Sequence, residues 1–163
     1  MRRSQAPAPS LSGHRHPPGQ DGTFDESERR VPWDELVVAR MLVKEGHHVR
    51  SLHERNGEGP RPDFDVCGVK TEVKTLDRGA SVQTMVNALT RGRNQGDVLI
   101  VNATDSGLSR RQADLGARRF AEKGELGRIT EARLIGAGFH LCYSRSDLNR
   151  LATRRPPELG AGL

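Results

Sequence analysis

The sequence has few of the features that mark membrane proteins, disulfide-rich secreted domains and zinc proteins. Its two cysteines, Cys67 and Cys142, are too few for a disulfide scaffold or a zinc cluster. No apolar run approaches the roughly 18–20 residues that cross a bilayer, so no membrane partner is expected. Arg2 and Arg3 are not followed by an apolar stretch, and no signal peptide is therefore visible. These absences predict a soluble, cytoplasmic protein.

Aromatic residues are also scarce, at 4% of 163 residues, and hydrophobic residues make up 34%. An average globular chain is about 45–50% apolar. Charge of one sign does not dominate, because 26 Lys and Arg residues face 21 Asp and Glu residues, for a net charge of +5. Mixed charge of this kind argues against a wholly disordered chain. The mild basic excess is compatible with a polyanionic partner such as nucleic acid.

The ends of the chain differ from its middle. Residues 1–30 are rich in proline and nearly free of apolar side chains, so they can bury too little surface to offset the entropy of ordering them. We predict a disordered N-terminal arm over 1–30, a single domain over 31–150, and a flexible tail over 151–163. The domain is long enough for one hydrophobic core.

The pattern within this domain alternates between helix and strand signals. In chain order it predicts a helix over 33–46, a strand over 47–52, a hairpin over 63–76, a helix over 81–96, a buried strand over 97–103, a helix over 110–124 and a strand within 130–144. This order predicts an α/β fold with a central mixed β-sheet flanked by helices.

The hairpin carries the residues with the clearest chemistry. Glu72 and Lys74 lie two apart in a strand and therefore share a face, and the hairpin can fold Asp63 back beside Glu72. Two carboxylates suit Mg²⁺, and a lysine beside the ion can help a water attack a phosphodiester. Asp65 shares the strand face of Asp63 and is an alternative to it. The competing interpretation is a loop acid followed by a solvated strand face, which a bare Glu-x-Lys pattern favours.

Pro62-Asp63 followed by Glu72-Val73-Lys74 resembles the PD-(D/E)xK signature of restriction-endonuclease-like nucleases. The flanking segments ARMLVKEGHHV and RPDFDVCGVKTEVKTL are similar to those of the C-terminal tRNase domains of CdiA-type contact-dependent growth inhibition toxins. The resemblance covers 33–144. It implies that Asp63, Glu72 and the main-chain carbonyl of Val73 bind Mg²⁺ or Mn²⁺, and that Lys74 serves the attacking water.

The same resemblance implies a restriction-endonuclease-like fold and a Mg²⁺-dependent endonuclease that cuts tRNA or other structured RNA. A toxin of this kind acts in the cytoplasm of a target cell and has a cognate immunity protein. Two alternatives remain open at this point. One is a DNA endonuclease of repair or restriction type, and the other is a non-catalytic module on the same fold that binds nucleic acid or a partner.

Two further polar residues are candidates for this site. Glu35 lies on a helix face with Ala39 and Leu42, where the resemblance implies a helical glutamate near the metal; the alternative is an acid favoured by the helix dipole. The resemblance also implies a glutamine near the substrate at Gln95, and the alternative is a polar helix end before Gly96.

Three arginines surround the same predicted helix and are candidates for contacts with substrate phosphates: Arg78, Arg91 and Arg93. Arginine binds phosphate bidentately, and few acids lie near these three in sequence. The alternative for each is a solvated helix face.

Overall fold

A seven-stranded mixed sheet runs through the centre of the computed structural model, which describes residues 9–12, 19–53 and 61–154. The strands lie side by side in chain order and are β1 (Phe24–Asp25), β2 (Val49–Ser51), β3 (Phe64–Val66), β4 (Val69–Thr75), β5 (Val98–Ala103), β6 (Glu131–Gly136) and β7 (Phe139–Ser144). Strands β4, β5 and β6 are parallel, and the β2–β3, β3–β4 and β6–β7 pairs are antiparallel. The predicted α/β fold with a central mixed sheet is confirmed.

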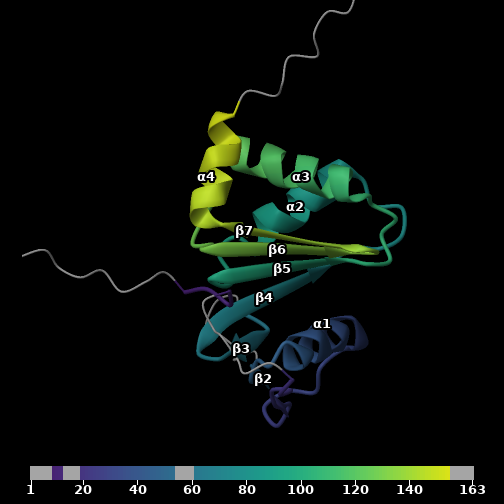
Figure 1. Ribbon diagram of the computed structural model, residues 1–163, viewed down its shortest axis with the longest axis vertical. Helices are drawn as coiled ribbons and strands as arrows, with labels where there is room; N and C mark the ends of the chain where they lie inside the picture. The colour runs from purple at the N-terminus through teal and green to yellow at the C-terminus, as the bar shows by residue number, and fades with distance from the viewer. Residues whose placement is uncertain (1–8, 13–18, 54–60, 155–163) are drawn as a thin grey trace, which may run out of the picture.

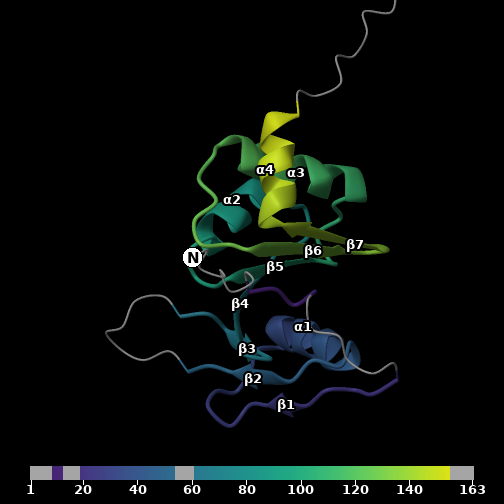
Figure 2. The same ribbon diagram turned by 60° about the vertical axis from the view of Figure 1, so that its left-hand side comes forward.

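Helices cover both faces of this sheet (Figures 1 and 2). They are α1 (Trp33–Lys44), α2 (Val82–Gly92), α3 (Arg110–Glu122) and α4 (Arg145–Thr153). Helices α2, α3 and α4 pack on the face of β5 to β7, and α1 packs on the opposite face beside β2 to β4. Within the described part of the chain, none of the helices has the length and apolar character that a membrane span requires.

Strand β5 joins the two cores because both of its faces are buried. Leu99 and Val101 belong to the cluster under α2 and α3, whereas Val98 and Ile100 belong to the cluster under α1. Alternate side chains of a strand point to opposite faces, so one apolar run serves two layers of helices. The buried strand predicted over 97–103 is therefore confirmed.

Serine residues cap the starts of three helices, and a glycine follows the end of α1. Ser81, Ser109 and Ser144 each form a capping box at the start of α2, α3 and α4. Gly46 follows α1 with a φ of 93°, a left-handed conformation that favours glycine. The helices predicted over 33–46, 81–96 and 110–124 begin within one residue of α1, α2 and α3.

The C-terminal part of the fold contains more structure than the sequence predicts. A single strand is predicted within 130–144, but β6 and β7 form an antiparallel pair with Gly136 opposite Phe139, and Gly138 in the turn has a φ of 80°. Helix α4 then continues to Thr153, across the predicted start of the tail at 151. The short polar sequence of α4 lacks a strong helical pattern, and its packing against α3 and β7 supplies the missing stability. Residues 155–163 lie outside the described residues.

The interpretation of residues 1–30 as a disordered arm is wrong for their described parts. Leu11 is 1% exposed and belongs to the cluster under α1, and β1 pairs with β2. Composition does not reveal these contacts, because the described segment is held by only two apolar side chains, Leu11 and Phe24, and by backbone hydrogen bonds. Residues 1–8 and 13–18 lie outside the described residues.

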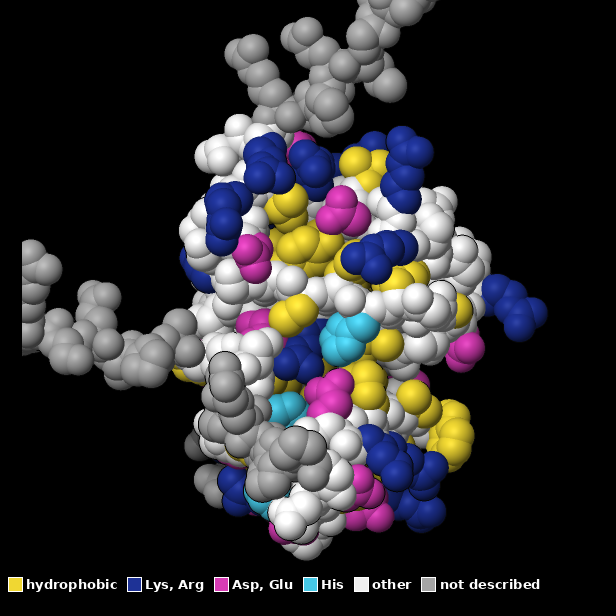
Figure 3. Space-filling view, in the orientation of Figure 1, with side chains coloured by type: hydrophobic (Ala, Val, Ile, Leu, Met, Phe, Trp, Pro, Cys, Tyr) yellow, Lys and Arg dark blue, Asp and Glu magenta, His cyan; other side chains and the backbone are white. Residues whose placement is uncertain are grey.

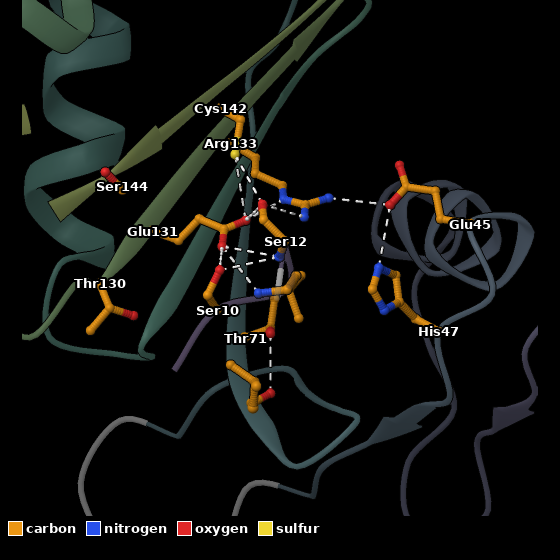
Figure 4. Close-up of polar contacts among 12 residues, drawn as sticks. Ser10, Ser12, Glu45, His47, Thr71, Thr130, Glu131, Arg133, Cys142 and Ser144 are labelled. Atoms are coloured by element: carbon orange, nitrogen blue, oxygen red, sulfur yellow. Dashed lines mark hydrogen bonds and ion pairs between the residues drawn. The ribbon is translucent and has the colours of Figure 1, made fainter. Parts of the chain in front are cut away.

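Glu131 holds this N-terminal segment against the start of β6 (Figure 4). Its carboxylate, which is buried, accepts hydrogen bonds from the hydroxyl of Ser10 and from the backbone N–H of Leu11 at 3.0 Å. The guanidinium of Arg133 pairs with the same carboxylate and also with Glu45, at 3.2 Å. The network therefore joins the N-terminal segment, β6 and the end of α1.

The ionisation of Glu131 makes this attachment dependent on pH. Burial raises the pKa of Glu131, but the hydrogen bonds from Ser10 and Arg133 and the charge of Arg133 outweigh burial, so its pKa lies below the usual value. A carboxylate with a lowered pKa stabilises the fold above its unfolded pKa, and this contribution is lost as the pH falls through its folded pKa.

We expect Glu131→Gln to lower the free energy of unfolding by about 1–3 kcal/mol near neutral pH, since Arg133 loses its charged partner on β6 and keeps only the ion pair with Glu45. The difference from the wild type should shrink below a pH of about 4. Urea denaturation across a pH series measures it, with Glu122→Gln on the exposed side of α3 as the matched control. A difference that stays constant with pH would contradict the role given to Glu131.

Candidate active site

The β3–β4 hairpin brings Asp63 opposite Glu72. Its two-residue turn, Cys67–Gly68, has φ values of 49° and 85°, as a tight hairpin turn with two left-handed residues requires. Phe64 pairs with Thr71 in this register, so the next pair outward is Asp63 with Glu72. Residues directly opposite each other on antiparallel strands lie close together, which places the two carboxylates side by side.

Lys74 and the backbone of β4 complete the contacts around these carboxylates. The ammonium of Lys74 lies 2.6 Å from Oε1 of Glu72. The N–H of Val73 donates a hydrogen bond of 2.9 Å to Oδ2 of Asp63. The structure thus brings together Asp63, Glu72 and Lys74, as the hairpin pattern predicts. The role of the Val73 carbonyl as a metal ligand stays a prediction.

Asp65, the alternative acid on the same strand face, is engaged by the hairpin itself. Its carboxylate lies 2.8 Å from the ammonium of Lys70 and accepts a hydrogen bond of 2.8 Å from the N–H of Gly68. These contacts stabilise the turn. Asp63 is therefore the acid that faces Glu72.

Glu35 and Arg29 close the side of the site nearest α1. Glu35 lies in the first turn of α1, and its Oε2 is 2.6 Å from a guanidinium nitrogen of Arg29. The same nitrogen lies 3.7 Å from Oδ1 of Asp63. Glu35 is therefore near the carboxylate pair, as the resemblance implies, and Arg29 bridges it to Asp63.

Sequence reasoning missed Arg29 because it lies within the segment predicted to be an arm. Nothing in the local pattern distinguishes it from the neighbouring Arg30. Its position follows only from the path of the chain past β2, where its Nε donates a hydrogen bond of 3.0 Å to the carbonyl of Leu52.

Burial raises the pKa of both carboxylates. Burial raises the pKa of Asp63, and the charge of Glu72 raises it further, to about 7, although Arg29 and Lys74 oppose the shift. Burial likewise raises the pKa of Glu72, while Lys74 lowers it. Two adjacent carboxylates that share a site retain a proton between them, and a cation bound there takes the place of that proton.

The residues fit a hard divalent cation in this position. Oε2 of Glu72 is buried and has no hydrogen-bond partner among the described residues. The other such oxygen among them, Oε1 of Gln95, lies in the turn after α2, and no hydrogen bond joins it to the carboxylate pair. Mg²⁺ commonly uses one or two protein carboxylates and takes its other ligands from water and phosphate. The described residues contain no group of three or more His, Cys, Asp or Glu side chains that could hold a metal ion.

A cavity of about 460 Å³ adjoins Lys74, and only some of the arginines predicted to contact the substrate line it. Arg78 and Arg91 line it together with Lys74. Arg93 instead pairs with Glu125 at 3.5 Å, where the chain approaches β6. The cavity therefore joins two of the three predicted arginines to the candidate catalytic lysine.

Other basic side chains lie outside this cavity. Figure 3 shows Lys and Arg side chains gathered over the part of the surface formed by α3 and α4, with Asp and Glu side chains among them. The net charge of +5 is thus spread over the surface and mixed with acids. Arg78 and Arg91 are distinguished by lining the same cavity as Lys74.

We expect Arg29→Gln to raise the pKa of Asp63 above its value of about 7, because the charge of Arg29 favours the ionised carboxylate. Carbon-detected NMR titration of the Asp63 carboxyl group in metal-free protein measures this shift. Arg30→Gln, which removes an exposed charge one residue away, should leave the titration unchanged. An unaltered pKa of Asp63 in Arg29→Gln would show that the charge of Arg29 does not stabilise the ionised carboxylate of Asp63.

Comparisons with known proteins give one distant similarity. No family model and no curated protein matches the chain. Among solved structures, the chain is similar to a chain of the "CdiA-CT/CdiI toxin and immunity complex from Burkholderia pseudomallei", with a TM-score of 0.48 and 17% sequence identity. The alignment covers 76% of this chain and 99% of that chain. At this level the similarity assigns neither a family nor a function to this chain.

Proposed function

We propose that this protein is a metal-dependent endonuclease that hydrolyses phosphodiester bonds in structured RNA, with tRNA as the favoured substrate. The observation that carries the proposal is the meeting of Asp63, Glu72 and Lys74 at one end of the hairpin, in the order of the PD-(D/E)xK signature. The buried, unpartnered oxygen of Glu72 supports a cation at this point. Structural carboxylates are normally satisfied by hydrogen bonds, so an orphan oxygen favours a ligand-binding role.

In this proposal some side chains bind the metal ion and others orient the attacking water. Asp63 and Glu72 hold the Mg²⁺ or Mn²⁺ ion, with the carbonyl of Val73 as the predicted third ligand. A bound ion of this kind offsets charge on the phosphodiester and lowers the pKa of a bound water. Lys74 orients the attacking water through its ammonium hydrogens, and Glu35 assists as a nearby carboxylate.

A DNA endonuclease of repair or restriction type is the second candidate, because the same side chains cleave either backbone. Direct contact with the 2′-hydroxyl distinguishes RNA from DNA. A non-catalytic module that binds nucleic acid or a partner is the third candidate. The raised pKa of Asp63 disfavours it, since a purely structural site gains nothing from a partly buried carboxylate that is repelled by a buried one.

We expect Glu72→Gln and Lys74→Ala each to reduce cleavage of tRNA by about 100-fold or more, because each removes a group that acts on the metal or the water. The assay incubates the purified chain with total tRNA and with plasmid DNA, each with Mg²⁺ and with EDTA. Matched controls are Glu122→Gln and Lys123→Ala, which change exposed residues of the same types at the end of α3.

The three candidate functions give different results in this assay. Cleavage of tRNA that requires Mg²⁺ and is lost in Glu72→Gln supports the proposal. Cleavage of plasmid alone supports the DNA endonuclease. Absence of cleavage, together with no rise in the unfolding temperature when Mg²⁺ or Mn²⁺ is added, indicates a non-catalytic module.

The resemblance to CdiA-type toxins supports growth inhibition and an immunity partner as part of the proposal. We expect expression of the chain in bacterial cytoplasm to arrest growth, and expression of Glu72→Gln to leave growth normal. A small acidic protein encoded beside this chain should relieve the arrest, since a basic cleft favours an acidic partner. Growth curves of cells that express the wild type, Glu72→Gln or Glu122→Gln measure this. If Glu72→Gln arrests growth as strongly as the wild type does, nuclease activity is not the cause of the arrest.

A further inference from the structure

The cavity beside Lys74 has the dimensions and lining of a binding site for a small charged molecule. It lies between the C-terminal end of β4 and α2, and its volume is about 460 Å³. Thr84, Ala88 and Arg91 are spaced four and three residues apart, so one face of α2 lines it. The loop after β4 supplies Arg78.

The lining divides into an apolar part and a cationic part. Leu76 and Ala88, both buried, provide apolar surface against which a flat ring can pack. Lys74, Arg78 and Arg91 provide three cations. An apolar surface beside several cations is the combination that a nucleotide requires, because its base is largely apolar on its faces and its phosphate is anionic.

We propose that this cavity binds one unpaired nucleotide of the RNA, immediately next to the phosphodiester that is cut. The proposal rests on the proposed function and adds the class of RNA: the strand must be single-stranded or unstacked at the cut. A base that remains paired in a helix cannot enter a cavity with protein on several sides. Lys74 lines the cavity and contacts Glu72, so a nucleotide seated there directs its phosphate toward the carboxylate pair.

Polar groups in the lining match the edge and backbone of such a nucleotide. Gln83 donates a hydrogen bond of 3.0 Å to Oδ1 of Asn87, which leaves the amide hydrogens of Asn87 to donate to an acceptor of the base or ribose. Asp77 accepts hydrogen bonds and therefore suits an exocyclic amino group. The charge of Asp77 offsets part of the positive charge that Lys74, Arg78 and Arg91 give to the lining.

The test is binding of short RNA in EDTA, where metal-dependent cleavage does not occur. Fluorescence anisotropy compares a labelled single-stranded RNA of mixed sequence with the same sequence closed in a hairpin stem. We expect the single strand to bind more tightly. Arg91→Ala should weaken its binding about tenfold or more, as expected for loss of a charged hydrogen bond. Asn87→Trp, which places a large ring at the exposed rim, should block it.

Arg119→Ala on the exposed side of α3 is the matched control and should bind as the wild type does. Unfolding temperatures establish that each variant is folded. Equal binding of single strand and stem, wild-type binding by both cavity variants, or absence of RNA binding would each overturn the proposal.

Failure of the cavity and failure of the nuclease give different results. If Mg²⁺-dependent cleavage occurs but both cavity variants bind single-stranded RNA normally, the nuclease holds and the cavity is not the nucleotide site. If the cavity variants lose binding while the wild type cuts nothing, the nucleotide site holds and the catalytic proposal fails.

Discussion

The register of the β3–β4 hairpin determines which side chains share the site. The two-residue turn at Cys67–Gly68 pairs Val66 with Val69, and every further pair along the hairpin follows from that choice. A shift of one residue would turn Glu72 and Lys74 to the opposite face, because the side-chain period of a strand is two. The same register directs Val73 into the core under α1, so apolar packing holds the polar site in place.

The site places two carboxylates side by side, and cationic side chains from other parts of the chain offset their negative charge. Asp63 is partly buried beside Glu72, and burial together with the charge of Glu72 raises the pKa of Asp63 to about 7. Lys74 compensates from the same strand, and Arg29 compensates from the segment before α1. Carboxylates with raised pKa values release protons when a cation binds, which connects the electrostatics to the proposed metal chemistry.

The helices on the two faces of the sheet contribute different residues to the proposed metal and nucleotide sites. Helix α1 brings Glu35 to the carboxylates, and α2, packed on the opposite face, brings Arg91 to the cavity beside Lys74. Strand β4 lies between the two helices and connects the proposed metal site with the proposed nucleotide site. The N-terminal segment, attached through Glu131, is part of the same packed structure.

The sequence by itself determined the local structure of the molecule. Glycine and serine at the helix ends, the apolar run of β5 and the Asp-to-Glu-x-Lys spacing are local patterns, and each depends on backbone conformation or strand alternation within a few residues. Only the tertiary structure decided the positions of Arg29 and Leu11, the pairing of Arg93 with Glu125, and the cavity between β4 and α2. These depend on contacts between residues far apart in the chain, where burial and charge, rather than local conformational preference, set the energy.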